Sequence, residues 1–367
     1  MIKKVLFVVL NIIMGIKFTT LFKMVLRYGI GLNPKYILRF LFLLPNSLIS
    51  QILVWVETIK FKKKIGQTTI EKPPVFIIGH WRSGTTFLHQ LIYLDSQFTA
   101  PTVVQTILPE HFLFSTKYYV PFLNKIMPEK RPMDEVELKP FAPMEDEFAL
   151  IRMGSVSPFV RLIFPSVKAK FLSDFREFIP EGKEFVKWEK NLSTFMKKIT
   201  FLTHKQIVLK NPYHTPRMLL LSEMFPGARF IHMVRHPYKI IPSGINMWDI
   251  VSKENSLKNG WEKPTIDEAA EVLEKFLRYV DENKGKLGEN EFAEVKFEDL
   301  EANPVIELKR LYKELNFGFT SEFEARINQF MEEKKNYKKN SFNLSPVEKN
   351  IIHNRLSHYF KTFNYDI

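Results

Sequence analysis

Residues 73–86 constrain the fold of this chain more than any other part of the sequence. Residues 75–78 form a short apolar run that is typical of a buried parallel strand. Gly79 and Gly84 then enclose four residues, and Thr85 opens a segment with apolar residues at helical spacing. Such a loop and helix start leave backbone N–H groups unpaired, so they bind anions. The stretch therefore predicts an anion-binding loop between a strand and a helix of an α/β fold.

The loop comes close to the Walker phosphate loop, GxxxxGK[ST], but departs from it at one position. Thr85 stands where that motif has its ATP-binding lysine, and Arg82 places a cation inside the loop instead. This exchange indicates a nucleotide other than ATP. A P-loop kinase or NTPase stays as an alternative of another class, which ATP hydrolysis with magnesium would test. The simplest alternative is an ordinary βα turn that contains two glycines.

Charge is concentrated at the start of the chain. The 367 residues carry a net charge of +13, which favours anionic partners. Residues 1–66 contain eleven Lys or Arg and one acid, Glu57, and so account for +10 of it. The remainder is almost balanced, so we expect no nucleic-acid partner. The chain lacks cysteine, which excludes disulfides, thiolate metal sites and a cysteine nucleophile.

The charge distribution predicts two parts, a basic helical segment at 1–66 and a main domain at 67–367. Apolar runs at 5–16, 38–44 and 48–56 lie beside basic residues, as in proteins that rest on an anionic membrane surface. The first run is too short to cross a bilayer. We expect a cytoplasmic protein with peripheral membrane contact at the cytoplasmic face. The alternative is a helical cap that packs on the main domain.

Two further apolar runs end in cations. Residues 206–209 are followed by Lys210, and residues 229–234 are followed by Arg235. In a parallel sheet, ligands bind where the strands end. We therefore predict a three-layer, P-loop-like α/β fold with a central parallel sheet, in which these cations lie near the glycine loop.

Three blocks of this sequence resemble the sulfotransferases that use 3′-phosphoadenosine 5′-phosphosulfate (PAPS). They are the loop at 78–86, the segment 224–243 with its Arg and Ser eight residues apart, and the segment 295–304. The resemblance is clearest to the bacterial branch and to the membrane-associated protein-tyrosine sulfotransferases, and it extends to the cytosolic members. It covers residues 73 to about 320.

The resemblance implies a role for each matching residue. It implies that Arg235 and Ser243 bind the 3′-phosphate, and that Lys210 lies on the sulfonate and the leaving oxygen. Phe297 stands where the family usually has Tyr. The family needs no metal, because the protein supplies position and positive potential. The loop residues that would hold the 5′-phosphosulfate are Arg82, Ser83, Gly84, Thr85 and Thr86.

The general base is left open by the sequence. An acceptor hydroxyl must lose its proton, usually to His or Glu. His111 and His214 are the first two candidates, and Glu110 and Glu147 are the acidic ones. A late basic loop near residues 338–339 is expected to supplement the 3′-phosphate site.

The apolar composition suggests the acceptor. The chain contains 34 Phe, more than an ordinary core requires, and its first segment is apolar. We expect transfer to a hydroxyl of a sterol, phenol or lipid-like molecule. Transfer to a carbohydrate or glycolipid is the alternative, although the chain has only five Trp for sugar stacking. A catalytically inactive, membrane-bound scaffold is disfavoured by the intact cations.

Overall fold

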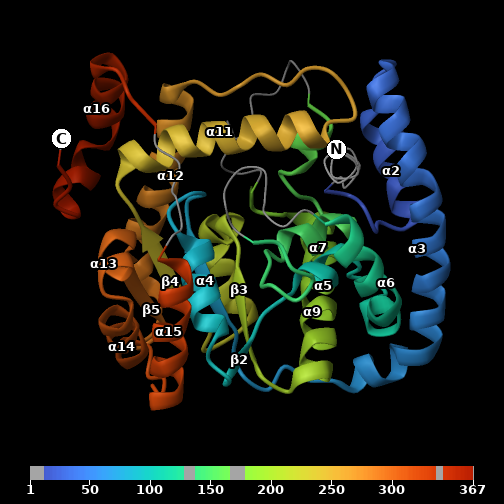
Figure 1. Ribbon diagram of the computed structural model, residues 1–367, viewed down its shortest axis with the longest axis horizontal. Helices are drawn as coiled ribbons and strands as arrows, with labels where there is room; N and C mark the ends of the chain where they lie inside the picture. Colours follow the sequence, from blue (N-terminus) through green and yellow to red (C-terminus); the bar gives the residue numbers. More distant parts are fainter. Residues whose placement is uncertain (1–11, 128–136, 166–177, 336–341, 367) are drawn as a thin grey trace.

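Five parallel strands form the centre of the computed structural model, which describes residues 12–127, 137–165, 178–335 and 342–366 (Figure 1). The strand order is β2-β3-β1-β4-β5, and every pairing is parallel. This confirms the predicted α/β fold with a central parallel sheet. The strands are β1 (Val75–Gly79), β2 (Phe98–Thr99), β3 (Gln206–Lys210), β4 (Arg229–Val234) and β5 (Phe292–Lys296).

Helices cover both faces of the sheet, which gives the three layers. Side chains of a strand alternate between faces, so Phe76 and Ile78 enter one core while Val75 and Ile77 enter the other. The first core is shared with α9 (Gly182–Thr203), α10 (Met218–Met224), α11 (Pro237–Asn255), α12 (Ile266–Asn283) and α16 (Pro346–Thr362). The second is shared with α4 (Thr85–Tyr93), α13 (Phe297–Ala302), α14 (Pro304–Glu314) and α15 (Ser321–Lys334).

The end of β1 lies at the point where the strand order reverses. From β1 the chain passes through α4 to β2 and β3 on one side, and then returns to β4 on the other side. Crevices at such switch points bind ligands in open α/β sheets. The glycine loop after β1 is therefore flanked by the ends of β3 and β4, where Lys210 and Arg235 lie.

Two helices precede the sheet, and the second is the longest of the described helices. They are α2 (Phe18–Tyr28) and α3 (Pro34–Gln67). The apolar runs at 38–44 and 48–56 form this single helix, which continues through Pro45. Figure 1 shows α3 in blue along one edge of the molecule, where it contacts α2, α6 (Phe112–Ile126) and α9. Of the apolar run at 5–16, residues 5–11 lie outside the described residues.

Arg39 of α3 joins this helix to the C-terminal end of α11. Its guanidinium donates to the carbonyl oxygens of Lys253 at 3.0 Å and Ser256 at 2.7 Å. The last carbonyls of a helix carry partial negative charge and have no partner within the helix. The buried arginine therefore supplies donors that the end of α11 needs, and it attaches α3 to the main body.

The second half of α6 contains a proline but stays helical. Residues 118–126 continue α6, and Pro121 lies inside that helix. Leu123 and Ile126 are buried, so packing of the apolar face outweighs the helix-breaking tendency of proline. The remaining short elements are α5 (Val103–Ile107), α7 (Glu147–Arg152), α8 (Val160–Ile163) and two 3₁₀ turns at Pro212–Arg217 and Lys284–Lys286.

Candidate active site

Two glycines allow the loop after β1 to pack closely. Gly79 has φ +134°, and a Cβ there would lie 2.5 Å from the carbonyl oxygen of Met233. Gly84 has φ +103°, and a Cβ there would lie 2.2 Å from Cδ2 of Phe297. Both positions combine a left-handed backbone with no room for a side chain. The loop conformation therefore requires glycine at each end.

The loop ends at an uncapped helix N-terminus. Gly84 is the N-cap of α4 and supplies no side-chain acceptor, so the first amides of the helix are left for another acceptor. Two hydrogen bonds fix the loop. Ser83 Oγ donates to the carbonyl of His80 at 2.7 Å within the loop, and the Gly79 amide donates at 2.8 Å to Thr215 Oγ1 of the turn after β3. Fixed amides together with a helix dipole make an anion site.

Arg82, Ser243 and Arg235 meet on one side of this loop. Arg82 Nε donates to Ser243 Oγ at 2.9 Å. Arg235 Nη1 donates to the carbonyl oxygen of Arg82 at 3.0 Å, and its guanidinium carbon lies 4.1 Å from the centre of the Phe297 ring. A cation over a ring face is held in place by the ring quadrupole. The structure thus brings together four predicted site residues, Phe297 included, from three different segments of the sequence.

Lys210 lies on the other side of the loop. Its Nζ donates to Thr86 Oγ1 at 3.3 Å and forms an ion pair with Glu145. The lysine side chain is only 3% exposed, while the Glu145 side chain is 14% exposed. Glu145 was not among the sequence candidates. Glu145 and Lys210 are 65 residues apart, so no local pattern links them. The one signal in the sequence was an acid shortly before α7.

The acids of residues 145–147 have separate partners. Asp146 Oδ2 lies 2.8 Å from His214 Nε2. Glu147 accepts from Arg217 Nη1 at 2.8 Å and from Asn211 at 2.8 Å. Burial alone would raise the pKa of the Glu147 carboxyl, but Arg217 and Asn211 outweigh it and hold that pKa below its usual value. Asp146 and Glu147 are fully buried, so Glu145 is the one partly exposed member of the run.

The base candidates from the sequence have partners away from the loop. His111 is fully buried, its Nδ1 lies 2.7 Å from Ser115 Oγ, and burial together with Lys198 lowers its pKa to about 3. Glu110 forms an ion pair with Lys17 at 2.6 Å. His214 and Glu147 hold the buried contacts described above. The expected basic loop near residues 338–339 lies outside the described residues.

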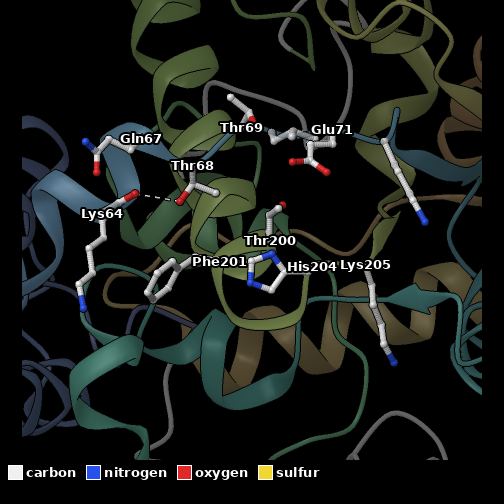
Figure 2. A pocket seen from close by; sticks show the side chains of 11 residues that line it. Lys64, Gln67, Thr68, Thr69, Glu71, Thr200, Phe201, His204 and Lys205 are labelled. Atoms are coloured by element: carbon white, nitrogen blue, oxygen red, sulfur yellow. Dashed lines mark hydrogen bonds between the residues drawn. The ribbon is translucent and has the colours of Figure 1, made fainter.

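A hollow of about 360 Å³ lies at the opposite end of the strands (Figure 2). It is lined by residues 67–72, which precede β1, and by His204 and Lys205, which precede β3. Ligands of parallel sheets bind where strands end, not where they begin. This hollow therefore does not belong to the site around the glycine loop. In the described part of the chain, no group of three or more His, Asp or Glu is placed to hold a metal ion.

A sequence profile described as the sulfotransferase family matches residues 73–321. The chain belongs to the sulfotransferase family. Two curated relatives are the omega-hydroxy-beta-dihydromenaquinone-9 sulfotransferases of Mycobacterium bovis and Mycobacterium tuberculosis. Each is 31% identical over 322 residues, which cover 87% of this chain and 82% of the relative. The resemblance to bacterial sulfotransferases is thus confirmed, and the chain is a sulfotransferase enzyme.

Solved sulfotransferase structures share the fold. One from Mycobacterium avium superposes with a TM-score of 0.67 at 15% identity and covers 96% of this chain and 98% of its own. One from Mycobacterium tuberculosis superposes with a TM-score of 0.61 at 15% identity, with coverages of 91% and 90%. At this identity the likeness concerns the fold. The sulfotransferase profile covers β1, the glycine loop and β3 to β5, which are the elements that position the site.

Proposed function

We propose that this sulfotransferase moves the sulfuryl group of PAPS to a hydroxyl of a lipid-like acceptor. The observation that carries the proposal is the meeting of Arg82, Arg235 and Lys210 around one glycine loop at the start of α4. A doubly phosphorylated nucleotide with a sulfonate needs several separate anion contacts, and such contacts are strongest when donors are charged. The loop and its three cations match that need.

The donor-binding residues follow from the placement of these cations. The 5′-phosphosulfate is assigned to the loop amides, to Arg82 and to the hydroxyl of Thr86. The 3′-phosphate is assigned to Arg235 and Ser243, on the side of β4. Arg235 is positioned by the Phe297 ring and by the loop carbonyl. Ser83, Gly84 and Thr85 complete the predicted donor site. The shape of the loop depends on two of them, because Gly84 permits the close approach to Phe297 and Ser83 fixes the turn.

The transfer is an in-line displacement at sulfur. The acceptor oxygen forms a bond to sulfur while the bond from sulfur to the 5′-phosphate oxygen breaks. The electron pair of the broken bond leaves with 3′-phosphoadenosine 5′-phosphate. Lys210 and Arg82 stabilise the charge that develops on the sulfonate and the leaving oxygen. Lys210 suits this role because its Nζ lies 3.3 Å from Thr86 Oγ1 of the loop.

Glu145 is proposed as the group that accepts the proton of the acceptor hydroxyl. A general base must lie within hydrogen-bond reach of its substrate. Glu145 contacts Lys210 and keeps an exposed edge, whereas His111 and His214 are both fully enclosed. The carboxylate therefore stands beside the cation that holds the sulfonate. This replaces His111 and His214 as the preferred candidates.

The proposed acceptor is a lipid-like alcohol. The name of the mycobacterial relatives describes a menaquinone derivative with a terminal hydroxyl as the acceptor, and the 31% identity extends over most of both chains. The apolar surface of α3 agrees with a lipid substrate. We also propose that residues 1–66 act as a segment that contacts a membrane, with 67–367 as the catalytic domain.

A transfer assay tests this function. Purified enzyme would be incubated with ³⁵S-labelled PAPS and, separately, with a hydroxylated prenyl quinone, a sterol, a phenol and an oligosaccharide, each in detergent. We expect label in the prenyl quinone or another lipid alcohol. Label in the oligosaccharide alone would overturn the acceptor class. Hydrolysis of ATP with magnesium and no use of PAPS would overturn the donor.

A further inference from the structure

Four of the seven buried positions of the long helix α3 are polar, whereas many of its apolar side chains are exposed. Its buried positions include Arg39, Ser47, Ser50 and Glu57, which are at most 6% exposed. A surface helix of a water-soluble protein shows the reverse arrangement, with an apolar stripe toward the core. An exposed apolar face combined with buried polar groups therefore indicates that the outer side of α3 is an interaction surface.

The apolar side chains of α3 form one continuous strip. Their exposed fractions range from 47% to 85%, and their spacing of three, four or seven residues keeps them on one side of the helix. At a rise of about 1.5 Å per residue, the strip is about 32 Å long. We call this strip the outer face of α3, and it consists of Leu38, Leu41, Leu48, Ile52, Trp55 and Ile59.

A basic cluster adjoins the outer face. Lys60, Lys62, Lys63 and Lys64 follow directly in the sequence, and all four are exposed. The single acid of α3, Glu57, is buried and bound to Lys198 at 2.5 Å. The exposed side of the helix therefore combines apolar and cationic groups with no acidic group of its own. This is the pattern of helices that lie on anionic lipid.

The attachment of α3 at both ends decides how the helix lies. Arg39 binds the end of α11 near one end of the helix, and Glu57 binds Lys198 of α9 near the other. Among the described helices, α3 has the length and apolarity needed to cross a bilayer. Its contacts with α2, α6 and α9, however, keep it along the edge of the enzyme, as Figure 1 shows. A helix held in this way rests on a surface and does not cross it.

A groove beside the basic cluster continues the same surface. It has a volume of about 690 Å³ and lies between α3 and α6. Phe61, Phe114 and Phe141 line it together with Lys60 and Lys117, and the Lys60 Nζ lies 4.5 Å from the centre of the Phe114 ring. Aromatic rings beside lysines are typical of the boundary between lipid tails and headgroups.

From these observations we infer that the outer face of α3 and the basic cluster dock on an anionic lipid bilayer, with α3 parallel to the membrane plane. The apolar side chains enter the boundary between headgroups and acyl chains, and the lysines bind headgroup phosphates. A second copy of the chain fits this surface less well, because α3 offers no exposed acid to receive four lysines. The inference deepens the proposal that residues 1–66 contact a membrane, and it does not depend on the proposed donor or acceptor.

Vesicle flotation tests the inference with the full-length chain. Vesicles of phosphatidylcholine containing phosphatidylglycerol would be compared with pure phosphatidylcholine. We expect strong binding to the first and weak binding to the second. The double variant Ile52→Glu/Trp55→Glu should reduce binding by about tenfold or more, because two charges enter the apolar boundary. The matched control Ile306→Glu/Val347→Glu alters two equally exposed apolar side chains elsewhere and should bind like wild type.

The lysines are tested separately. Lys62→Gln/Lys63→Gln should lower binding to phosphatidylglycerol vesicles by about fivefold for each charge removed. Lys263→Gln/Lys313→Gln removes two exposed charges elsewhere and should change little. All variants should keep the affinity of wild type for 3′-phosphoadenosine 5′-phosphate, which shows that they fold.

Three outcomes would overturn the inference. One is a wild-type chain that does not bind anionic vesicles. Another is equal binding by the α3 variant and its control. The third is a dimer in light scattering that Ile52→Glu/Trp55→Glu dissociates, without vesicle binding, which would identify a second copy as the occupant of this face. A failed sulfuryl transfer assay would leave the flotation result intact, so the proposed transfer reaction and the membrane docking fail separately.

Discussion

Two buried lysine–glutamate pairs in this enzyme have the same composition but different surroundings. Lys198 pairs with Glu57 at 2.5 Å beneath α3, and Lys210 pairs with Glu145 beside the glycine loop. A buried histidine accompanies each pair: Lys198 lowers the pKa of His111, and Lys210 lowers that of His89, both in addition to burial. The two clusters therefore allow an internal comparison between a closed pair and a pair in the proposed active site.

The difference lies in what else each pair contacts. Lys198 also donates to the carbonyl of Pro109 at 2.9 Å, and the Glu57 side chain is only 3% exposed. Burial raises the pKa of Glu57 against the pull of Lys198, as expected for a closed pair. Lys210 instead touches Thr86 of the loop, and Glu145 keeps an exposed edge. The Lys210–Glu145 pair can therefore take part in a reaction, because it borders the proposed donor site.

The largest effect is expected from Glu145→Gln. Loss of the proposed base should lower kcat by about 10²- to 10⁴-fold, with the affinity for 3′-phosphoadenosine 5′-phosphate within about twofold of wild type. Glu57→Gln is the matched control, because it removes the same charge from the closed pair. It should destabilise the fold and leave kcat of the folded enzyme nearly unchanged. If Glu145→Gln retains most of its turnover, the base lies elsewhere.

Lys198→Met should have the largest effect on stability. It leaves the buried Glu57 carboxylate without its cation, which costs about 3–5 kcal/mol of unfolding free energy. Urea denaturation at neutral pH would measure this loss. Lys210→Met is the comparison, and it should lower turnover by about 10²- to 10³-fold with a smaller loss of stability. Equal stability losses in both variants would remove the distinction between the two pairs.

Arg235→Ala should act mainly on donor binding. The arginine side chain is assigned to the 3′-phosphate, and a hydrogen bond to a charged group is worth about 1.5–3 kcal/mol. We expect the Kd for 3′-phosphoadenosine 5′-phosphate to rise by about 10- to 150-fold, measured by titration calorimetry. Adenosine 5′-phosphosulfate, which lacks the 3′-phosphate, should bind both forms about equally. An equal loss for both nucleotides would place Arg235 outside the 3′-phosphate site.

The smallest effect concerns pH. Burial lowers the pKa of His80 from 6.5 to about 4 and contributes most to lowering those of His89 and His111 to about 3. Below pH 6.5 the unfolded chain therefore binds more protons than the folded one, so stability falls as the pH decreases toward 4. Each histidine contributes at most about 1.4 kcal/mol per pH unit. His111→Gln should flatten the curve of unfolding free energy between pH 6.5 and 4.5, and an unchanged slope would contradict this account.

The sequence was sufficient for three of the five strands and for the edge of the sheet that carries the cations. The apolar runs at 206–209 and 229–234 became β3 and β4, with Lys210 and Arg235 where these strands end. Strands buried on both faces are continuous apolar runs, and a charge after such a run marks its end. The approach of Arg235 to Arg82 follows from parallel pairing of β1 with β4.

The proposed base, Glu145, and the orientation of α3 could not be derived from the sequence in the same way. Glu145 reaches Lys210 across 65 residues, and no local pattern encodes such a contact. His111 and His214 were reasonable choices by residue type, but burial is a property of the packed structure. Likewise, the apolar runs of α3 indicated a helix without showing that Arg39 and Glu57 would turn inward.

The bond from Arg39 to the end of α11 has a geometric consequence. That helix carries Ser243 in its first half, and Ser243 holds Arg82. The part of α11 between Ser243 and its C-terminal end, about 18 Å long, therefore connects the edge helix to the proposed donor site. If α3 rests on a membrane as proposed, the plane of that membrane also fixes the direction in which the sulfonate of the proposed donor site points. An alcohol approaching along that plane always arrives from the same angle.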